Sequence, residues 1–336
     1  PSTSGNLLTS NGSAWISSAP EEVTRGTLTK TFTTGEVATM TLSSAVTAGA
    51  PVVSVSKEVP QTGVSNGNWD VNSTTENYTR LDSATATTLD WAGFDISSAS
   101  YTQNFDVSGQ DTIPHGIAFS ADGAKMFVIG QLGQDVNEYA LSSSFDVSTS
   151  VFVDSFSVSG QDTSPVGLAF NVDGSKMFVI GAVTDSVHEY ALSTGLDVST
   201  AVFTDAFSIG TQEPAPRDVA FSTDGSKMFV IGDNSDKVFE YSLSTSFDVS
   251  TSSYTREFSF TSQETQAQAI AFSNSGKEMF IVGLNADSVF KYTLTTGFDI
   301  STASYASVSF SVAAQDTAPV GLAFSADGTK MFMLGA

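Results

Sequence analysis

Residues 165–180 read PVGLAFNVDGSKMFVI, and versions of this stretch recur about every 51 residues between Phe94 and Ala336. The block Lys-Met-Phe begins at four lysines, and a degenerate copy begins at a glutamate: Lys125, Lys176, Lys227, Lys330 and Glu278. A second marker, Phe/Leu-Asp-Val/Ile-Ser, has the same period and starts at Phe94, Phe145, Leu196, Phe247 and Phe298. Such a period is typical of stacked supersecondary units that bury their apolar faces against their neighbours.

Each repeat contains four short segments with the patterns of β-strands. In the second repeat, apolar runs at 167–170 and 176–180 flank Asp173-Gly174, which predicts a hairpin with a type I′ turn. Two alternating segments follow at 186–192 and 202–209. Four antiparallel strands repeated around an axis form a β-propeller. The sequence therefore predicts an all-β protein whose main part is a propeller of four-stranded blades.

The repeats resemble the YVTN and NHL-like propeller repeats, in which a Pro-x-Gly segment precedes an apolar strand, an Asp-Gly turn and an aromatic strand. This resemblance covers residues 94–336 and implies a fold rather than a function. The fourth repeat departs from the pattern, because Ala267 and Ala269 stand at its Pro and Gly positions.

Five blades are visible, and the last one stops after its second strand. The segment Ser100 to Val107 has the pattern of an outer strand with no blade before it, so we expect it to complete the last blade and close the ring. One strand of a five-bladed ring would still be missing. We therefore expect the natural chain to continue beyond Ala336.

The first 92 residues have a different pattern. Residues 1–23 are rich in Ser, Thr, Gly and Asn, which predicts an extended connector. Residues 24–92 contain alternating segments separated by turn residues, which predicts a small all-β module of the sandwich type. The propeller is assigned to residues 93–336.

A second resemblance concerns this N-terminal part. Residues 5–15, GNLLTSNGSAW, are similar to segments of bacteriophage tail fibres and other virion appendages. Residues 58–63, EVPQTG, and 69–72, WDVN, resemble modules of marine phage structural proteins. The resemblance covers about the first quarter of the chain and implies a structural protein at the virion surface.

Composition narrows the range of functions. The formal net charge is −23, from 13 basic and 36 acidic residues, which disfavours nucleic-acid and membrane-surface partners. The chain has no cysteine, so it has neither disulfides nor thiolate metal sites. The two histidines, His115 and His188, lie at non-equivalent positions of different repeats, and no Gly-x-Ser-x-Gly motif is present. We therefore expect no metal, no cofactor and no catalytic residue.

Acidic residues recur at the junction between consecutive blades. They follow a recurring glutamine and would surround one mouth of the axial channel: Asp111, Asp162, Glu213, Glu264 and Asp316. One interpretation is a ring that binds a cation or a polar ligand. The other, which we favour because the feature recurs in every blade, is a repeated cap for backbone N–H groups.

A second candidate surface is formed by positions that vary between repeats. They lie between the Pro and Gly positions of the first strand and in the loops between the second and third strands. We expect both sets on one rim, opposite the Asp-Gly turns, and loops on rigid scaffolds often carry recognition. The predicted binding residues are His115, Gln131, Leu132, Val166, Val183, Thr184, Arg217, Asp233, Asn234, Gln268 and Asn285.

The leading functional hypothesis from sequence is a non-enzymatic virion appendage, a tail fibre or receptor-binding protein located on the virion surface or outside the cell. We expect it to bind a host cell-surface glycan or protein through the variable rim, to contact other virion structural proteins and to trimerise through its N-terminal region. The alternative is a secreted or cell-surface bacterial adhesion protein. A third class is a propeller lactonase or glycosidase with its site at the channel mouth.

Overall fold

The computed structural model describes residues 93–336 in full, and of the preceding residues it describes six short strands. The chain divides into two compact units, residues 1–89 and 90–336. The strands of the first unit form three antiparallel pairs, β1 (Leu8–Ser10) with β2 (Trp15–Ser17), β3 (Thr27–Thr31) with β4 (Val37–Thr41), and β5 (Asn68–Val71) with β6 (Tyr78–Leu81). The first pair lies within the predicted connector. The predicted sandwich packing lies outside the described residues.

Four complete four-stranded antiparallel sheets make up blades one to four of the second unit. Blade one comprises β7 (Pro114–Phe119), β8 (Lys125–Gly130), β9 (Asp135–Leu141) and β10 (Ser150–Ser157). Blade two comprises β11 (Pro165–Phe170), β12 (Lys176–Gly181), β13 (Ser186–Leu192) and β14 (Ala201–Ser208). Blade three comprises β15 (Pro216–Phe221), β16 (Lys227–Gly232), β17 (Lys237–Leu243) and β18 (Ser252–Ser259). Blade four comprises β19 (Ala267–Phe272), β20 (Glu278–Gly283), β21 (Ser288–Leu294) and β22 (Ala303–Ser311).

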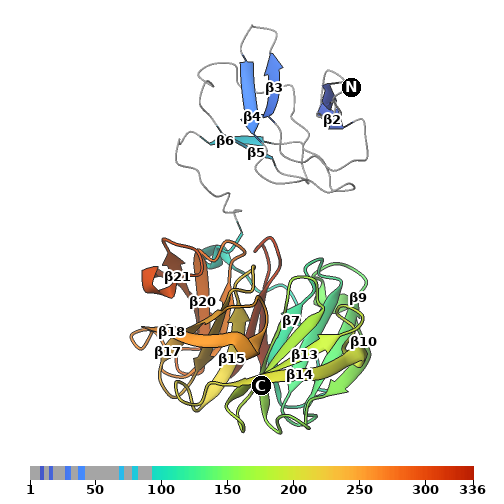
Figure 1. Cartoon of the computed structure of the whole chain (residues 1–336), viewed down its shortest axis with the longest axis vertical. Coiled ribbons are helices and arrows are strands. Elements are labelled where there is room, and N and C mark those ends of the chain that lie inside the picture. The colour runs from blue at the N-terminus through green and yellow to red at the C-terminus, as the bar shows by residue number, and fades with distance from the viewer. Residues whose placement is uncertain are drawn as a thin grey trace. The chain divides into compact units, whose positions relative to one another are not determined.

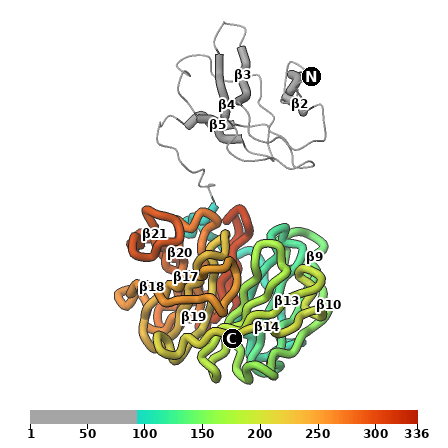
Figure 2. Tube along the Cα trace, in the orientation of Figure 1, coloured from blue at the N-terminus to red at the C-terminus, as the bar shows by residue number. Residues whose placement is uncertain are grey.

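The innermost strands close these blades into a ring with a fifth, incomplete blade of β23 (Pro319–Phe324) and β24 (Met331–Gly335). Each innermost strand lies beside the next, in the order β7, β11, β15, β19 and β23, and β23 in turn lies beside β7. The sheets follow the order of the sequence from cyan to red in Figure 1, and Figure 2 traces the same path along the backbone. The predicted β-propeller with an incomplete last blade is therefore confirmed.

The start of the second unit contributes to the fifth blade. The Phe94 amide donates to the Gly328 carbonyl over 2.7 Å, and the Phe94 ring centroid lies 5.4 Å from that of Phe324. Residues 100–107, predicted as an outer strand, do not form a strand. An outer strand needs a third strand to pair with, and no described residue occupies that position of blade five.

The apolar core lies between consecutive blades. One cluster joins Phe178 and Ile180 of blade two to Val219, Met228 and Tyr241 of blade three, all of them buried. The Met-Phe pair of each repeat therefore packs between sheets, as expected for stacked units whose stability depends on their neighbours.

The Asp-Gly turn differs from the predicted type. In blade two, Gly174 has a positive φ of 69° whereas Asp173 does not, so the turn is not type I′, in which both central residues need positive φ. The Gly174 amide donates to the Asn171 carbonyl over 3.0 Å, and the Asp173 carboxylate accepts from the Ser175 amide over 2.9 Å. A longer loop with a single left-handed glycine therefore joins the two strands.

The Phe/Leu-Asp-Val/Ile-Ser marker packs against this glycine. Its first residue has positive φ in every blade, and in blade one the Phe145 amide donates to the Gly123 carbonyl over 2.9 Å. The following aspartate caps a short 3-10 helix by accepting from the amide two residues later. These helices are η1 (Ile96–Ser98), η2 (Val147–Thr149), η3 (Val198–Thr200), η4 (Val249–Thr251) and η5 (Ile300–Thr302).

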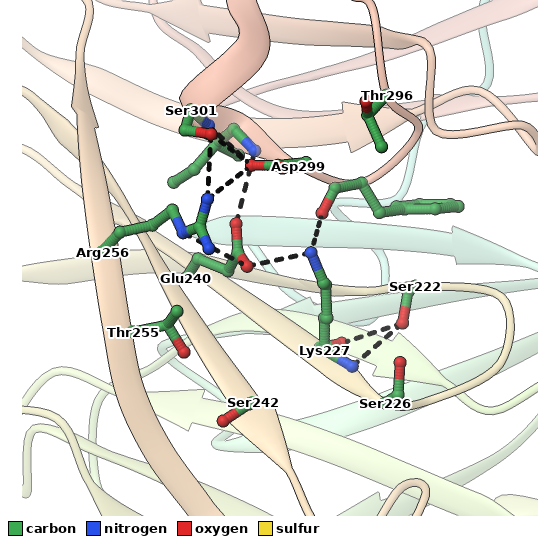
Figure 3. Close-up of polar contacts among 12 residues, drawn as sticks. Ser222, Ser226, Lys227, Glu240, Ser242, Thr255, Arg256, Thr296, Asp299 and Ser301 are labelled. Atoms are coloured by element: carbon green, nitrogen blue, oxygen red, sulfur yellow. Dashed lines mark hydrogen bonds and ion pairs between the residues drawn. The ribbon is translucent and has the colours of Figure 1, made fainter.

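A lysine–glutamate pair clamps each of the first three blades to the next one. In blade three, Lys227 Nζ lies 2.9 Å from Glu240 Oε1 and donates to the Phe298 carbonyl of blade four over 2.6 Å (Figure 3). Glu240 Oε2 also accepts from the Ile300 amide of blade four over 3.3 Å. Arg256 adds a 2.7 Å ion pair with Asp299. The recurring lysine of the Lys-Met-Phe block thus joins two blades.

Candidate functional site at the central axis

The five acids predicted at the channel mouth are hydrogen-bonded to backbone amides. In blade two, Asp162 Oδ1 accepts from the Ser164 amide over 2.6 Å, and Oδ2 accepts from the Thr184 amide over 2.8 Å. The acids of blades one, three and four make the same pair of contacts, and Asp316 accepts from the Ala318 amide over 2.6 Å. Asp162 is 2% exposed. Each carboxylate thus caps backbone amides. It connects the segment that leads from one blade to the next with the loop between the second and third strands.

Neighbouring residues of each repeat fit this cap. A Cβ atom on Gly181, at the end of the second strand, would stand 2.1 Å from Asp162 Oδ2, so glycine leaves room for the carboxylate. Gln161 accepts from the Tyr190 hydroxyl over 3.2 Å. The Gln-Asp pair of the repeat therefore fixes both the third strand and the loop before it.

A β-bulge interrupts the start of every innermost strand. The bulged residue lies between the Pro and Gly positions of the repeat. A bulge changes the direction of a side chain relative to the regular alternation along a strand. These five residues, one per blade, are His115, Val166, Arg217, Gln268 and Val320. The most variable position of the first strand is thus also the bulged one.

His115 and Arg217 are the bulged residues that carry basic side chains. Burial lowers the pKa of His115, a hydrogen bond with Gln131 opposes this effect, and the positive charge of Arg217 lowers the pKa further. The two residues come from blades one and three, which are not adjacent, and both lie on innermost strands of the ring, β7 and β15. His115 is therefore neutral at neutral pH.

Arg217 is oriented by an acid on the same rim. Its Nη2 and Nε atoms lie 2.6 Å and 3.1 Å from Asp233 Oδ2, and Gln131 Nε2 donates to the Ser164 hydroxyl. The side chains of Arg217 and Asp233 are 27% and 21% exposed. The pair is therefore partly open to solvent, and it leaves Nη1 of the guanidinium out of the contact.

The remaining predicted rim residues have mixed environments. Leu132 and Val183 are each 63% exposed, and Asn234 is also exposed. Thr184 contributes its amide and its hydroxyl to the Asp162 cap, and the Asn285 amide donates to Glu264 over 3.2 Å. Val166 and Gln268 are buried. Four of the predicted rim residues thus form two polar pairs, His115 with Gln131 and Arg217 with Asp233, and we call these four the polar group at the axis.

Asp218 is a residue that sequence reasoning missed. It follows Arg217 at the position held by glycine in three other repeats, and its carboxylate accepts from the Val219 and Ile270 amides over 2.9 Å and 3.0 Å. Burial raises the pKa of Asp218 to about 7. A charged residue at a repeat position otherwise held by Gly or Ala was the signal that could have revealed it.

Metal-binding and membrane-spanning features are both absent from the fully described part of the chain. Within 93–336, no cluster of three or more His, Asp or Glu side chains has a geometry suited to holding a metal ion. No helix in the same range has the length and apolar character needed to cross a membrane.

Known proteins resemble the chain in fold alone. No family model and no curated protein matches the sequence. The fold is similar to a protein of unknown function from Desulfotomaculum acetoxidans, with 14% identity, a TM-score of 0.43 and coverage of 66% of this chain and 62% of that chain. It is similar to a protein proposed to be a 6-phosphogluconolactonase from Bacteroides uniformis, with 15% identity, a TM-score of 0.44 and coverage of 65% and 62%. It is also similar to a periplasmic gluconolactonase from Pseudomonas aeruginosa, with 15% identity, a TM-score of 0.39 and coverage of 66% of this chain and 57% of that chain.

The matched region spans about three fifths of each of these proteins. Three of the solved structures with a similar fold carry a named activity: one is a gluconolactonase, and two are proteins proposed to be 6-phosphogluconolactonases. The expectation of a non-enzymatic virion appendage was therefore wrong. The predicted N-terminal trimerisation lies outside the described residues and stays a prediction.

Proposed function

We propose that the polar group at the axis binds a small polar molecule with an anionic group, and that it catalyses acid–base chemistry on that molecule. The observation that carries the proposal is that His115 and Arg217 stand at the bulged positions of two innermost strands, and that Arg217 is partly open to solvent beside Asp233. Arg217 supplies a cation that suits a carboxylate or a phosphate, because guanidinium groups donate to such anions in a planar fork.

His115 supplies the second chemical property. Because burial keeps its imidazole neutral, one ring nitrogen can accept a proton from water or from a hydroxyl of the bound molecule. Gln131 orients the ring by its hydrogen bond. Perturbed pKa values are typical of functional sites, and Asp218, next to Arg217 in blade three, has a second one.

Hydrolysis of a sugar-acid lactone is the first reaction to test. His115 would accept a proton as water attacks the lactone carbonyl carbon, the ring C–O bond would break, and the proton would return to the departing oxygen to give a hydroxy acid. The lactonases named above supply the choice of assay substrate. The proposal itself depends on the residues at the axis.

The test measures two quantities on the full chain. Binding of gluconate and 6-phosphogluconate is followed by calorimetry, and hydrolysis of 6-phosphogluconolactone, whose phosphate is the anionic group that the proposal requires, is followed with a pH indicator above the rate in buffer. We expect Arg217→Ala to weaken binding about tenfold or more, equivalent to about 1.4 kcal/mol. His115→Gln should lower the rate of hydrolysis and change binding little.

The matched control is Lys237→Ala, which removes a cation paired with Glu257 on the outer strands of blade three. This variant should bind and react like the unaltered protein. The proposal is overturned if the unaltered protein neither binds these acids nor exceeds the buffer rate, or if Lys237→Ala and Arg217→Ala behave alike.

A further inference from the structure

Asp218 places a carboxylate between the innermost strands of blades three and four. Its Oδ1 atom accepts from the Val219 amide of β15 over 2.9 Å, and its Oδ2 atom accepts from the Ile270 amide of β19 over 3.0 Å. These two hydrogen bonds lower the pKa of Asp218 and so oppose the effect of burial. The amides of two adjacent innermost strands can therefore hold one carboxylate together.

The Ile270 amide is available to this carboxylate because it points away from the second strand of its blade. Amides along a β-strand point alternately to its two sides. The Ser273 amide donates toward β20, to the Glu278 carbonyl over 2.9 Å. Ile270 lies three residues before Ser273, so its amide points to the opposite side, where Asp218 receives it.

The same alternation applies to blades one and two. There the Ser120 and Asn171 amides donate toward the second strand over 3.0 Å and 3.1 Å. Three residues earlier stand Ile117 on β7 and Leu168 on β11, and these two innermost strands lie side by side. Their amides therefore point away from the second strands, as the Ile270 amide does.

Glycine stands where a carboxylate could serve these two amides. Gly116 immediately precedes Ile117 and has the place in blade one that Asp218 has in blade three. A Cβ atom on Gly116 would stand 3.1 Å from the Leu168 nitrogen, so a side chain there would be aimed at this amide. Among the described residues, no side chain accepts from the Ile117 or Leu168 amide. Amides inside proteins almost always find an acceptor, so these two need one.

The inner edge of the ring is not sealed from solvent. Asp218 is buried between the blades, yet 9% of its surface is exposed, so a space that admits a water molecule lies beside it. In blade one, Ile117, Ala118 and Phe119 are all partly exposed. A small solute can therefore approach the innermost strand of blade one.

We propose that the Ile117 and Leu168 amides form a binding site, between blades one and two, for the carboxylate group of a small ligand. The ligand takes the place that the Asp218 carboxylate has between blades three and four. A carboxylate suits two converging amides better than a neutral acceptor does, because hydrogen bonds to an ionised group are stronger. The site consists of backbone atoms, so the inference is independent of the roles proposed for His115 and Arg217.

Formate is the probe, and formamide, which has nearly the same shape without the charge, is its matched control. Both are titrated into the full chain at constant ionic strength while nuclear magnetic resonance follows the amide signals. We expect formate to shift the Ile117 and Leu168 signals saturably and to bind at least about tenfold more tightly than formamide. The Val219 and Ile270 signals should stay in place, because Asp218 already accepts from their amides.

Two reciprocal variants exchange the residues of blades one and three. Asp218→Gly removes the built-in carboxylate, so formate should then also shift the signals of the two amides that Asp218 binds. Gly116→Asp should supply a carboxylate to the Ile117 and Leu168 amides and abolish their response to formate. A thermal melt checks that both variants are folded, and the comparison of the two probes on the unaltered protein does not depend on them.

Three results would overturn the proposal. The first is that formate does not shift the Ile117 and Leu168 signals saturably, and the second is that formamide binds as tightly as formate. The third is that Arg217→Ala abolishes the response to formate, because the guanidinium of the polar group at the axis would then hold the anion.

Discussion

Glu189 Oε2 accepts a 3.0 Å hydrogen bond from the Val249 amide, which belongs to the next blade of the propeller. The other oxygen of the same carboxylate lies 2.6 Å from Lys176 Nζ within its own blade. Glu189 is 5% exposed, and Val249 is fully buried. A single carboxylate therefore satisfies a cation and a buried amide across the boundary between two sheets.

Replacement of this carboxylate should be costly. We expect Glu189→Ala to lower the free energy of unfolding by about 2–4 kcal/mol, because Lys176 loses its partner and the Val249 amide is left buried without an acceptor. Urea denaturation measures the change. Glu257→Ala is the control, since Glu257 is 42% exposed in its pair with Lys237 and should contribute less than about 1 kcal/mol. Equal losses in the two variants would contradict the clamp.

Gly174 should not tolerate a side chain. Its φ is 69°, and a Cβ atom there would stand 2.2 Å from Leu196 Cγ, so we expect Gly174→Ala to destabilise the protein by more than about 2 kcal/mol. A Cβ atom on Gly160 would have no neighbouring atom within 4 Å, and Gly160→Ala should change stability by no more than about 0.5 kcal/mol. Thermal melts of both variants measure these changes in stability. A Gly174→Ala variant as stable as the unaltered protein would contradict the predicted clash.

Asp218 should make stability depend on pH. Burial raises its pKa from 3.8 to about 7, so the folded protein holds this proton more tightly than the unfolded chain does. The contribution to stability is complete below about pH 4, falls as the pH rises toward 7, and is constant above that value. Between about pH 4 and pH 7, the free energy of unfolding should therefore fall by an amount on the order of 4 kcal/mol because of Asp218.

Asp218→Asn should remove this part of the pH dependence. The measurement is the difference in unfolding free energy between the variant and the unaltered protein at several pH values from 2 to 8. Asp173→Asn is a control of opposite sign, because hydrogen bonds from Ser175 lower the pKa of Asp173, whose contribution is lost as the pH falls. A difference for Asp218→Asn that stays constant with pH would contradict the assignment.

The two histidines should titrate below pH 6.5, since burial lowers the pKa of both His115 and His188. Nuclear magnetic resonance of the imidazole nitrogens can follow both, and His115→Gln identifies the signal that disappears. A ligand at the axis should shift the His115 signal and leave that of His188 unchanged. If His115 instead titrates above 6.5, its proposed role as a neutral proton acceptor is lost.

The repeat made most of the propeller predictable. The third strand predicted at 186–192 matches β13 residue for residue, and the capping interpretation of the acids agrees with the contacts of Asp162. Both succeeded because the interactions are local and are copied in every blade. The type I′ turn failed because the pattern Asp-Gly does not fix the length of the loop around it.

The sequence by itself determined the period, the strands and the residues that cap each turn, because each of these depends on neighbours within one repeat. Only the tertiary structure decided that Phe94 joins β23 and β24 in the fifth blade, and that His115 and Arg217 stand at bulges of innermost strands in non-adjacent blades. It also decided that Asp218 is buried. These relations depend on how the ring closes, which brings together residues that are far apart in the chain.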